Sequence, residues 1–233
     1  MEIQIAVAKT NKYAVSESGD TLEVVERPNG GLSVVLADGQ TSGHGAKAVS
    51  MMVVRKVISL LAEGVRDGAA ARAASDLLYT DKQGKVTSTL NIVSVDLHTG
   101  TVVITRNNPA PFFIAHGEKI DRIGSESNSL GTVRNARPVI TEIPVEPGLV
   151  IVIYTDGLVH AGEKKGQPMD VPALLEKMLV QGPPDPDRWA ERLLAEAADL
   201  DAGRPTDDIS VLVAAILPRQ PGDARRLTLR MPL

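Results

Sequence analysis

The order of strand-like and helix-like segments is the feature that most limits how this chain of 233 residues can fold. Near the N-terminus, apolar residues alternate with polar ones over short runs; over residues 46–63 and 67–78 they recur at helical spacing. Several strand-like runs follow between residues 88 and 154, then two more helical segments and a last apolar run at 209–217. Because strands do not alternate with helices, the order argues against a doubly wound parallel sheet.

We therefore predict an α+β fold in which helices lie on the outer faces of largely antiparallel sheets. The expected strands are 3–7, 21–26, 32–37, 88–96, 102–106, 112–115, 139–143, 150–154 and 209–217, and the expected helices are 46–63, 67–78, 171–180 and 187–200. No internal repeat and no linker divides these elements, so we expect one domain over residues 1–217. Residues 218–233 contain several arginines and are expected to form an appended, flexible basic tail.

Composition excludes several classes of function. The absence of cysteine rules out disulfides, thiolate metal sites and cysteine nucleophiles. With 25 basic and 29 acidic residues, the chain has no overall positive field for nucleic acid or anionic lipid. The N-terminus lacks the basic and apolar blocks of a signal peptide, and the apolar runs are too short to span a membrane. We expect a cytoplasmic, monomeric enzyme that binds neither nucleic acid nor membrane.

Three aspartates lie beside strongly apolar runs. Asp38 and Asp156 each follow a predicted strand and precede a glycine, and Asp207 comes just before the last strand. One Asp-Gly pair alone is typical of a turn, but a turn does not require a strand of this kind beside it. Carboxylates held at strand ends offer the oxygen ligands that Mg²⁺ and Mn²⁺ prefer. The pattern therefore predicts metal-assisted phosphate chemistry.

Motifs around these aspartates resemble those of the metal-dependent Ser/Thr phosphatases of the PPM type. They are, in chain order, ESGD at 17–20, ADGQTSG at 37–43, YTDG at 154–157 and TDDIS at 206–210. The spacing from Asp38 to Ala46 is most similar to the bacterial branch that includes the sporulation phosphatase SpoIIE and the stressosome phosphatase RsbX. The resemblance covers about residues 1–217.

This resemblance implies a four-layer α/β/β/α sandwich with two divalent ions, Mn²⁺ or Mg²⁺, at one edge. By motif, Asp38 would bridge both ions, and the carbonyl of Gly39 would hold one of them. Asp156 and Asp207 would hold the other. Two ions close together lower the pKa of a bridging water and neutralise phosphoryl oxygens, so no protein nucleophile is needed. Asp38 and Asp156 are accordingly the principal catalytic candidates.

Two further aspartates belong to the implied metal site. Asp20 would act through a bound water. Asp208 occupies a position where the family has Asp or Asn, and it would either orient a ligand or share the metal.

The chain departs from the family pattern at several positions. Where members often have an aspartate for a third ion, residues 106–110 contain no carboxylate, which argues against a third ion. Many members also have an N-terminal arginine that grips the phosphate; here Lys12 is the candidate. The segment from 157 to 170 is short, which predicts a small flap or none and an open site. His44 is a candidate general acid for the leaving alkoxide, the alternative being a residue that only packs or caps at a helix start.

The resemblance leaves several functions open. A domain of this size is similar to the RsbX type, which implies phosphorylated STAS-domain proteins of a stressosome-like signalling complex as substrates. The nearest alternative is a SpoIIE-like or RsbU-like action on an anti-anti-sigma factor. A catalytically silent phosphoprotein-binding module on the same fold is a third reading. Neither a histidine-rich metal motif nor a basic patch favours another metal hydrolase or a nuclease.

Overall fold

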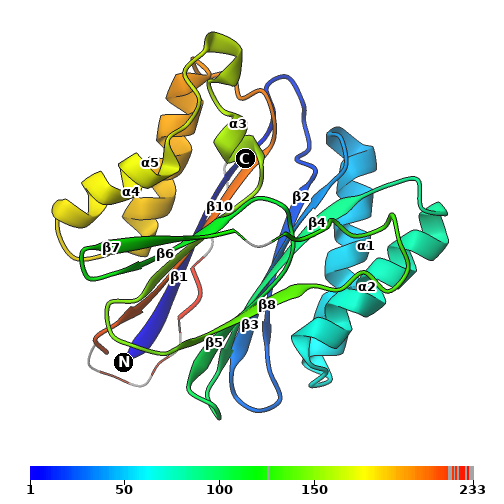
Figure 1. Ribbon diagram of the computed structural model, residues 1–233, viewed down its shortest axis with the longest axis horizontal. Helices are drawn as coiled ribbons and strands as arrows, with labels where there is room; N and C mark the ends of the chain where they lie inside the picture. The colour runs from blue at the N-terminus through cyan, green and yellow to red at the C-terminus, as the bar shows by residue number, and fades with distance from the viewer. Residues whose placement is uncertain (125, 220–221, 223, 225, 229, 231–233) are drawn as a thin grey trace.

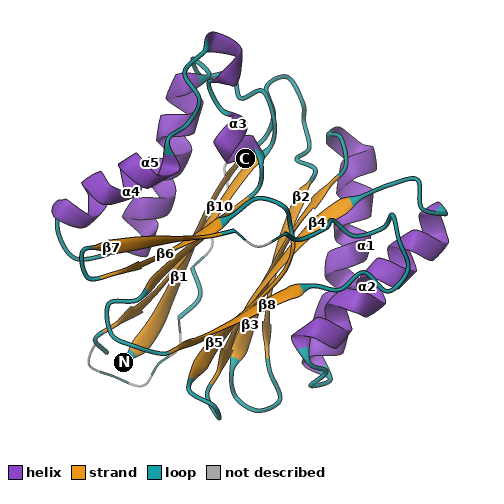
Figure 2. Ribbon diagram, viewed as in Figure 1, coloured by secondary structure: helices purple, strands orange, loops and turns teal. Residues whose placement is uncertain are grey.

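Two antiparallel sheets face each other, and helices cover the outer face of each (Figures 1 and 2). The computed structural model describes residues 1–124, 126–219, 222, 224, 226–228 and 230. The first five-stranded sheet has the order β1 (Glu2–Thr10), β10 (Ile209–Leu217), β9 (Val150–Tyr154), β6 (Phe112–His116), β7 (Lys119–Ile123). The second has the order β2 (Asp20–Glu26), β3 (Leu32–Gly39), β4 (Ser88–Asp96), β5 (Thr101–Asn107), β8 (Val139–Pro144).

The helices form the two outer layers. Helices α1 (Gly43–Ala62) and α2 (Asp67–Lys82) cover the second sheet, and α4 (Val171–Val180) and α5 (Pro186–Leu200) cover the first (Figure 1). A short helix α3 (Gly157–His160) and a 3-10 turn (Glu163–Lys165) follow β9. The predicted α+β sandwich of four layers is therefore confirmed. Among the helices of the described residues, none combines the length and apolarity needed to cross a membrane.

Strand β3 illustrates how the layers hold together. Val34 and Leu36 point into the apolar layer between the two sheets, whereas Val35 and Ala37 pack against α1 and α2. Both faces are therefore buried, and the strand is apolar almost throughout, without the alternation of a half-exposed strand. At the edge of the same sheet, β8 alternates between partly buried and exposed residues. The third apolar layer lies between the first sheet and α4 and α5.

Helix α5 begins where the sequence predicts. The Asp185 side chain accepts a hydrogen bond from the Arg188 N–H at 3.1 Å, and Pro186 occupies the first helical position. Trp189, Leu193 and Ala197 are buried on the face that packs on the sheet.

Strand β7 and helix α3 are absent from the sequence-based prediction. Strand β7 contains Lys119, Asp121 and Arg122, so its composition does not indicate a strand. It forms because the turn at residues 117–118 folds it back on β6 as a hairpin, and charged residues are tolerated on an edge strand. Of the predicted basic tail at 218–233, residues 220, 221, 223, 225, 229 and 231–233 lie outside the described residues.

Replacing Asp185 with alanine should lower the free energy of unfolding by about 1 kcal/mol, because the Arg188 N–H loses its capping acceptor. Urea unfolding measures this change. The control is Glu191→Ala, at an exposed position inside the same helix, where the expected change is within about 0.5 kcal/mol. Equal losses in the two variants would contradict the capping role.

Candidate metal centre

The predicted metal-binding aspartates gather at one end of the sandwich, and they come from both sheets. Asp20 begins β2 and is paired in register with Asp38 near the end of β3. Asp156 follows β9, and Asp207 and Asp208 precede β10. The Thr155 N–H donates to the Ser210 carbonyl at 3.0 Å, which keeps these last two segments side by side.

Asp20 is fully buried and joins the two sheets. Its Oδ2 accepts hydrogen bonds from Thr155 Oγ1 at 3.0 Å and from Ser210 Oγ at 2.5 Å. Its Oδ1 is buried and has no hydrogen-bond partner in the described part of the chain. A buried carboxylate oxygen is rarely left without a donor or a cation. The free Oδ1 therefore fits the coordination sphere of a metal ion or of its bound water.

The aspartates raise one another's pKa. Burial, and then the charges of Asp20 and Asp156, raise the pKa of Asp38 to about 9. Burial also raises the pKa of Asp20, against the hydrogen bond from Ser210. The pKa of Asp207 is raised by burial and by the charge of Asp156. Such crowding of negative charge is unfavourable unless protons or a cation compensate it, and a divalent ion does so most directly.

The carboxylates do not form a closed ligand set. Asp38 lies in contact with the buried Asp20, and Asp38, Asp156 and Asp207 are all half-buried. Among the described residues, no three Asp, Glu, His or Cys side chains come close enough together to hold an ion as they stand. The arrangement is an open cluster of carboxylates.

Asp208 is fully engaged with the backbone. Its Oδ1 accepts a hydrogen bond from the Lys12 N–H at 2.9 Å, and its Oδ2 accepts one from the Gly19 N–H at 2.8 Å. These bonds fix the segment that ends in Asp20. Asp208 was predicted either to orient a ligand or to share the metal, and these two hydrogen bonds support the orienting role. Lys12 itself lies near enough to Asp207 that its charge opposes the rise in the pKa of that carboxyl.

Two lysines that the sequence did not single out converge on Asp20. Lys9 Nζ and Lys47 Nζ donate to the Asp20 carbonyl at 2.6 and 2.7 Å. Part of the Lys9 side chain is exposed, but its ammonium points inward, and desolvation together with Lys47 lowers the pKa of Lys9. Two cations therefore lie beside the carboxylate cluster. Lys9 is the penultimate residue of β1 and Lys47 lies in α1, far apart in sequence, so no local motif predicts their meeting.

Gly39 and His44 lie on either side of the start of α1. A Cβ on Gly39 would be 2.0 Å from the Ala46 carbonyl oxygen, so only glycine allows the helix to approach the strand end this closely. His44 is on the surface: its side chain is 93% exposed, and its Nδ1 is 3.2 Å from Glu17 Oε2. The structure does not bring His44 against the aspartates, and its role as a general acid stays a prediction.

Comparison with known proteins identifies the family. The family model of stage II sporulation protein E (SpoIIE) matches residues 28–217. The chain belongs to the SpoIIE family. Stage II sporulation protein E of Priestia megaterium is 22% identical over 214 residues, which cover 92% of this chain and 36% of that protein. The protein of the same name from Bacillus subtilis (strain 168) is 21% identical, and the match covers 91% and 27%. The chain thus spans about a third of the length of these SpoIIE relatives.

Solved structures share the fold. The PP2C phosphatase domain of Bacillus subtilis SpoIIE, solved with a fragment of its regulatory domain, matches with a TM-score of 0.78 and 19% identity over 93% of this chain and 64% of that one. The phosphatase PstP, in complex with two manganese ions, matches with a TM-score of 0.71 and 16% identity over 93% and 99% of the two chains. RsbX in complex with magnesium matches with a TM-score of 0.67 and 18% identity over 91% and 94%. The predicted family and fold are confirmed.

Ser210→Ala should weaken Mn²⁺ binding by about tenfold, because Asp20 Oδ2 loses one of the two hydroxyl donors that orient this carboxylate. Isothermal titration calorimetry measures the affinity. Ser75→Ala is the control, since Ser75 is a buried serine of α2 that belongs to the core beside that helix. Unchanged affinity in Ser210→Ala would contradict the orienting role.

Asp38→Asn should stabilise the metal-free protein. A carboxyl whose pKa is raised in the folded state contributes stability that is lost as pH rises from about 4, where the unfolded chain ionises, to about 9. Without metal, the parent protein should therefore become less stable over this range. The variant should lose the part of this dependence that Asp38 contributes, while Asp20 and Asp207 keep theirs, and should gain on the order of 2 kcal/mol near neutral pH. Unfolding in excess chelator across this pH range measures both effects, and parallel pH profiles for parent and variant would contradict them.

Proposed function

We propose that this SpoIIE-family protein is a Mn²⁺- or Mg²⁺-dependent phosphatase that hydrolyses phosphoserine or phosphothreonine in proteins. The observation that carries the proposal is the buried Asp20 oxygen without a donor, within a cluster of aspartates whose pKa values are raised. The match to the SpoIIE family and the fold shared with phosphatase domains support it.

In the proposed mechanism, residues of the chain would hold two divalent ions, and no side chain would act as a nucleophile. Asp38, the Gly39 carbonyl, Asp156 and Asp207 would hold the ions, and Asp20 would bind through water. When bound, the ions supply an activated water and neutralise the phosphoryl oxygens. Two ions suffice in this proposal, because residues 106–110 offer no carboxylate for a third.

The surrounding residues hold this arrangement in place. Thr155 and Ser210 fix the Asp20 carboxylate, and Asp208 fixes the segment that leads to it. Lys9 and Lys47 place positive charge beside the cluster. Lys12, close to Asp207, is the proposed contact for a substrate phosphate.

The proposed substrates are phosphorylated STAS-domain proteins of a stressosome-like complex, acted on by a monomeric cytoplasmic enzyme formed by residues 1–217. The family match to SpoIIE supports the alternative substrate, a phosphorylated anti-anti-sigma factor. Assays on purified proteins of the two kinds, compared at equal enzyme and Mn²⁺ concentration, separate these alternatives by kcat/KM.

Hydrolysis of p-nitrophenyl phosphate should require Mn²⁺ or Mg²⁺ and should fall by at least about a hundredfold in Asp38→Ala and Asp156→Ala, because each would remove a ligand of the metal centre. Phosphate release with and without chelator measures this loss. The matched control is Asp96→Ala, at the opposite end of β4, which should keep its turnover. Full activity in excess chelator would overturn the metal mechanism. A parent protein that binds phosphoprotein without any turnover would instead indicate a silent binding module.

A further inference from the structure

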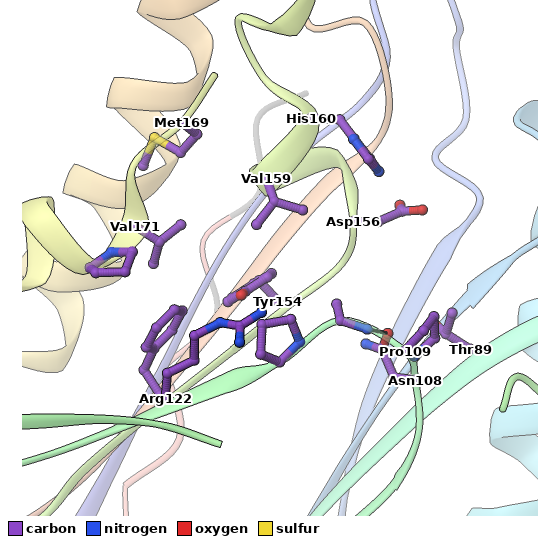
Figure 3. Close-up of a pocket in the computed structure, with 14 residues that line it drawn as sticks. Thr89, Asn108, Pro109, Arg122, Tyr154, Asp156, Val159, His160, Met169 and Val171 are labelled. Atoms are coloured by element: carbon purple, nitrogen blue, oxygen red, sulfur yellow. Dashed lines mark hydrogen bonds between the residues drawn. The ribbon is translucent and has the colours of Figure 1, made fainter. Parts of the chain in front are cut away.

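A cavity of about 460 Å³ opens beside Asp156 (Figure 3). Its floor is formed by apolar and aromatic side chains that are almost fully buried, including Phe113, Tyr154 and Val171. The volume lies within the range of roughly 300 to 1,000 Å³ that is usual for ligand pockets in proteins. Such a floor can receive an apolar side chain.

The cavity is continuous with the candidate metal centre. Asp156 lines it directly, and so does Thr89, which is paired in register with Asp38 across β3 and β4. A phosphoryl group held at the aspartates would therefore place the adjoining residues of its protein at the mouth of this cavity.

Arg122 gives the cavity a positive rim. It lies on the edge strand β7, and its guanidinium extends toward Tyr154 (Figure 3). Arg122 takes part in none of the ion pairs found among the described residues, whereas the neighbouring Asp121 is paired with Lys119 at 2.7 Å. The histidine on the opposite rim, His160, is 3.0 Å from Glu163. Arg122 is thus the cation of this cavity that is available to a carboxylate from outside.

Tyr154 forms part of the cavity floor, and its hydroxyl is covered. Its side chain is 1% exposed, and its hydroxyl has no hydrogen-bond partner within the described residues. Burial raises the pKa of this phenol, while the charges of Arg122 and Arg106 act in the opposite direction. Arg106 is itself buried and donates to the carbonyls of Asn108 and Ala110. The charges of two guanidinium groups therefore reach the Tyr154 side of the cavity, which favours an anionic occupant there.

We propose that this cavity is the subsite for the substrate residues next to the phosphorylated one, and that it selects an acidic segment. An apolar side chain of the substrate rests on the floor, and an Asp or Glu carboxylate pairs with Arg122. The inference rests on the proposed phosphatase function and names the class of phosphoprotein that the site prefers.

Phosphoserine peptides test the subsite directly. Each peptide of the first set carries a leucine beside the phosphoserine and one glutamate, which is moved through the nearby positions from peptide to peptide. In the matched set, glutamine replaces the glutamate. In Mn²⁺, the parent protein should favour the glutamate peptide at one position by about tenfold in kcat/KM, the size expected for one charge-assisted pair. Added salt should reduce this preference, since the pair is partly exposed.

Variants of Arg122 identify the residue responsible. Arg122→Ala should abolish the preference for glutamate, and Arg122→Glu should reverse it toward a lysine peptide. Arg55→Ala is the control, because Arg55 is an exposed arginine on α1 and does not line the cavity. A preference that survives in Arg122→Ala overturns the proposal.

Turnover of p-nitrophenyl phosphate separates the subsite from the metal centre, since this substrate has no flanking residues. If Arg122→Ala lowers its turnover as much as that of the glutamate peptide, Arg122 serves the metal centre and the subsite is overturned. If the parent hydrolyses it but treats every glutamate and glutamine pair alike, only the subsite fails. If the parent hydrolyses none of these substrates, the proposed function fails and the subsite with it.

Discussion

The burial of like charges where the two sheets end is the constraint on which the rest of this structure depends. Asp20 and Asp38 lie in contact at adjacent strand ends, and Asp156 and Asp207 are close enough to raise the pKa of Asp38. Folding alone does not favour such an arrangement, because each carboxylate loses water and gains repulsion. Hydroxyl donors and lysines of the surrounding chain offset part of this repulsion. A bound cation would offset the remainder.

The strands around the aspartate cluster hold it in place. Each aspartate lies at the end of a buried strand or directly beside one, so the apolar layers hold the backbone rigid while the carboxylates reach the sheet edge. Asp20 is bonded to Thr155 and Ser210 of the opposite sheet, so this end of the sandwich is held together by polar contacts. An apolar cluster fills much of the remaining interface between the sheets.

Much of the fold could be predicted from sequence because its signals are local. Strands β3, β9 and β10 are apolar runs, and the start of α5 is fixed by Asp185 and Pro186. Strand β7 could not be predicted, because an edge strand tolerates the charges that elsewhere indicate a loop.

The candidate site, like the fold, could be predicted from the sequence only in part. Its aspartates lie in recognisable motifs, and the structure brings them to one end of the molecule, while their individual roles remain predictions. Their partners were not predictable, because the bonds from Asp20 reach across 135 and 190 residues of sequence to side chains of no unusual type. The positions of Lys9 and Lys47 were not predictable either, because both donate to a backbone carbonyl, which any residue would supply.

The pairing of Asp20 with Asp38 links this site to the hairpin turn at the other end of β2 and β3. There the Arg27 N–H donates to the Gly31 carbonyl at 2.7 Å, and Gly31 lies so close to Val95 that a Cβ would be 2.1 Å from its carbonyl oxygen. Strand register has a period of two, so a shift of one residue would turn Asp20 to the opposite face. The length of a loop remote from the candidate metal centre therefore decides whether the two carboxylates meet at all, and a one-residue insertion there would separate them as surely as a substitution of either aspartate.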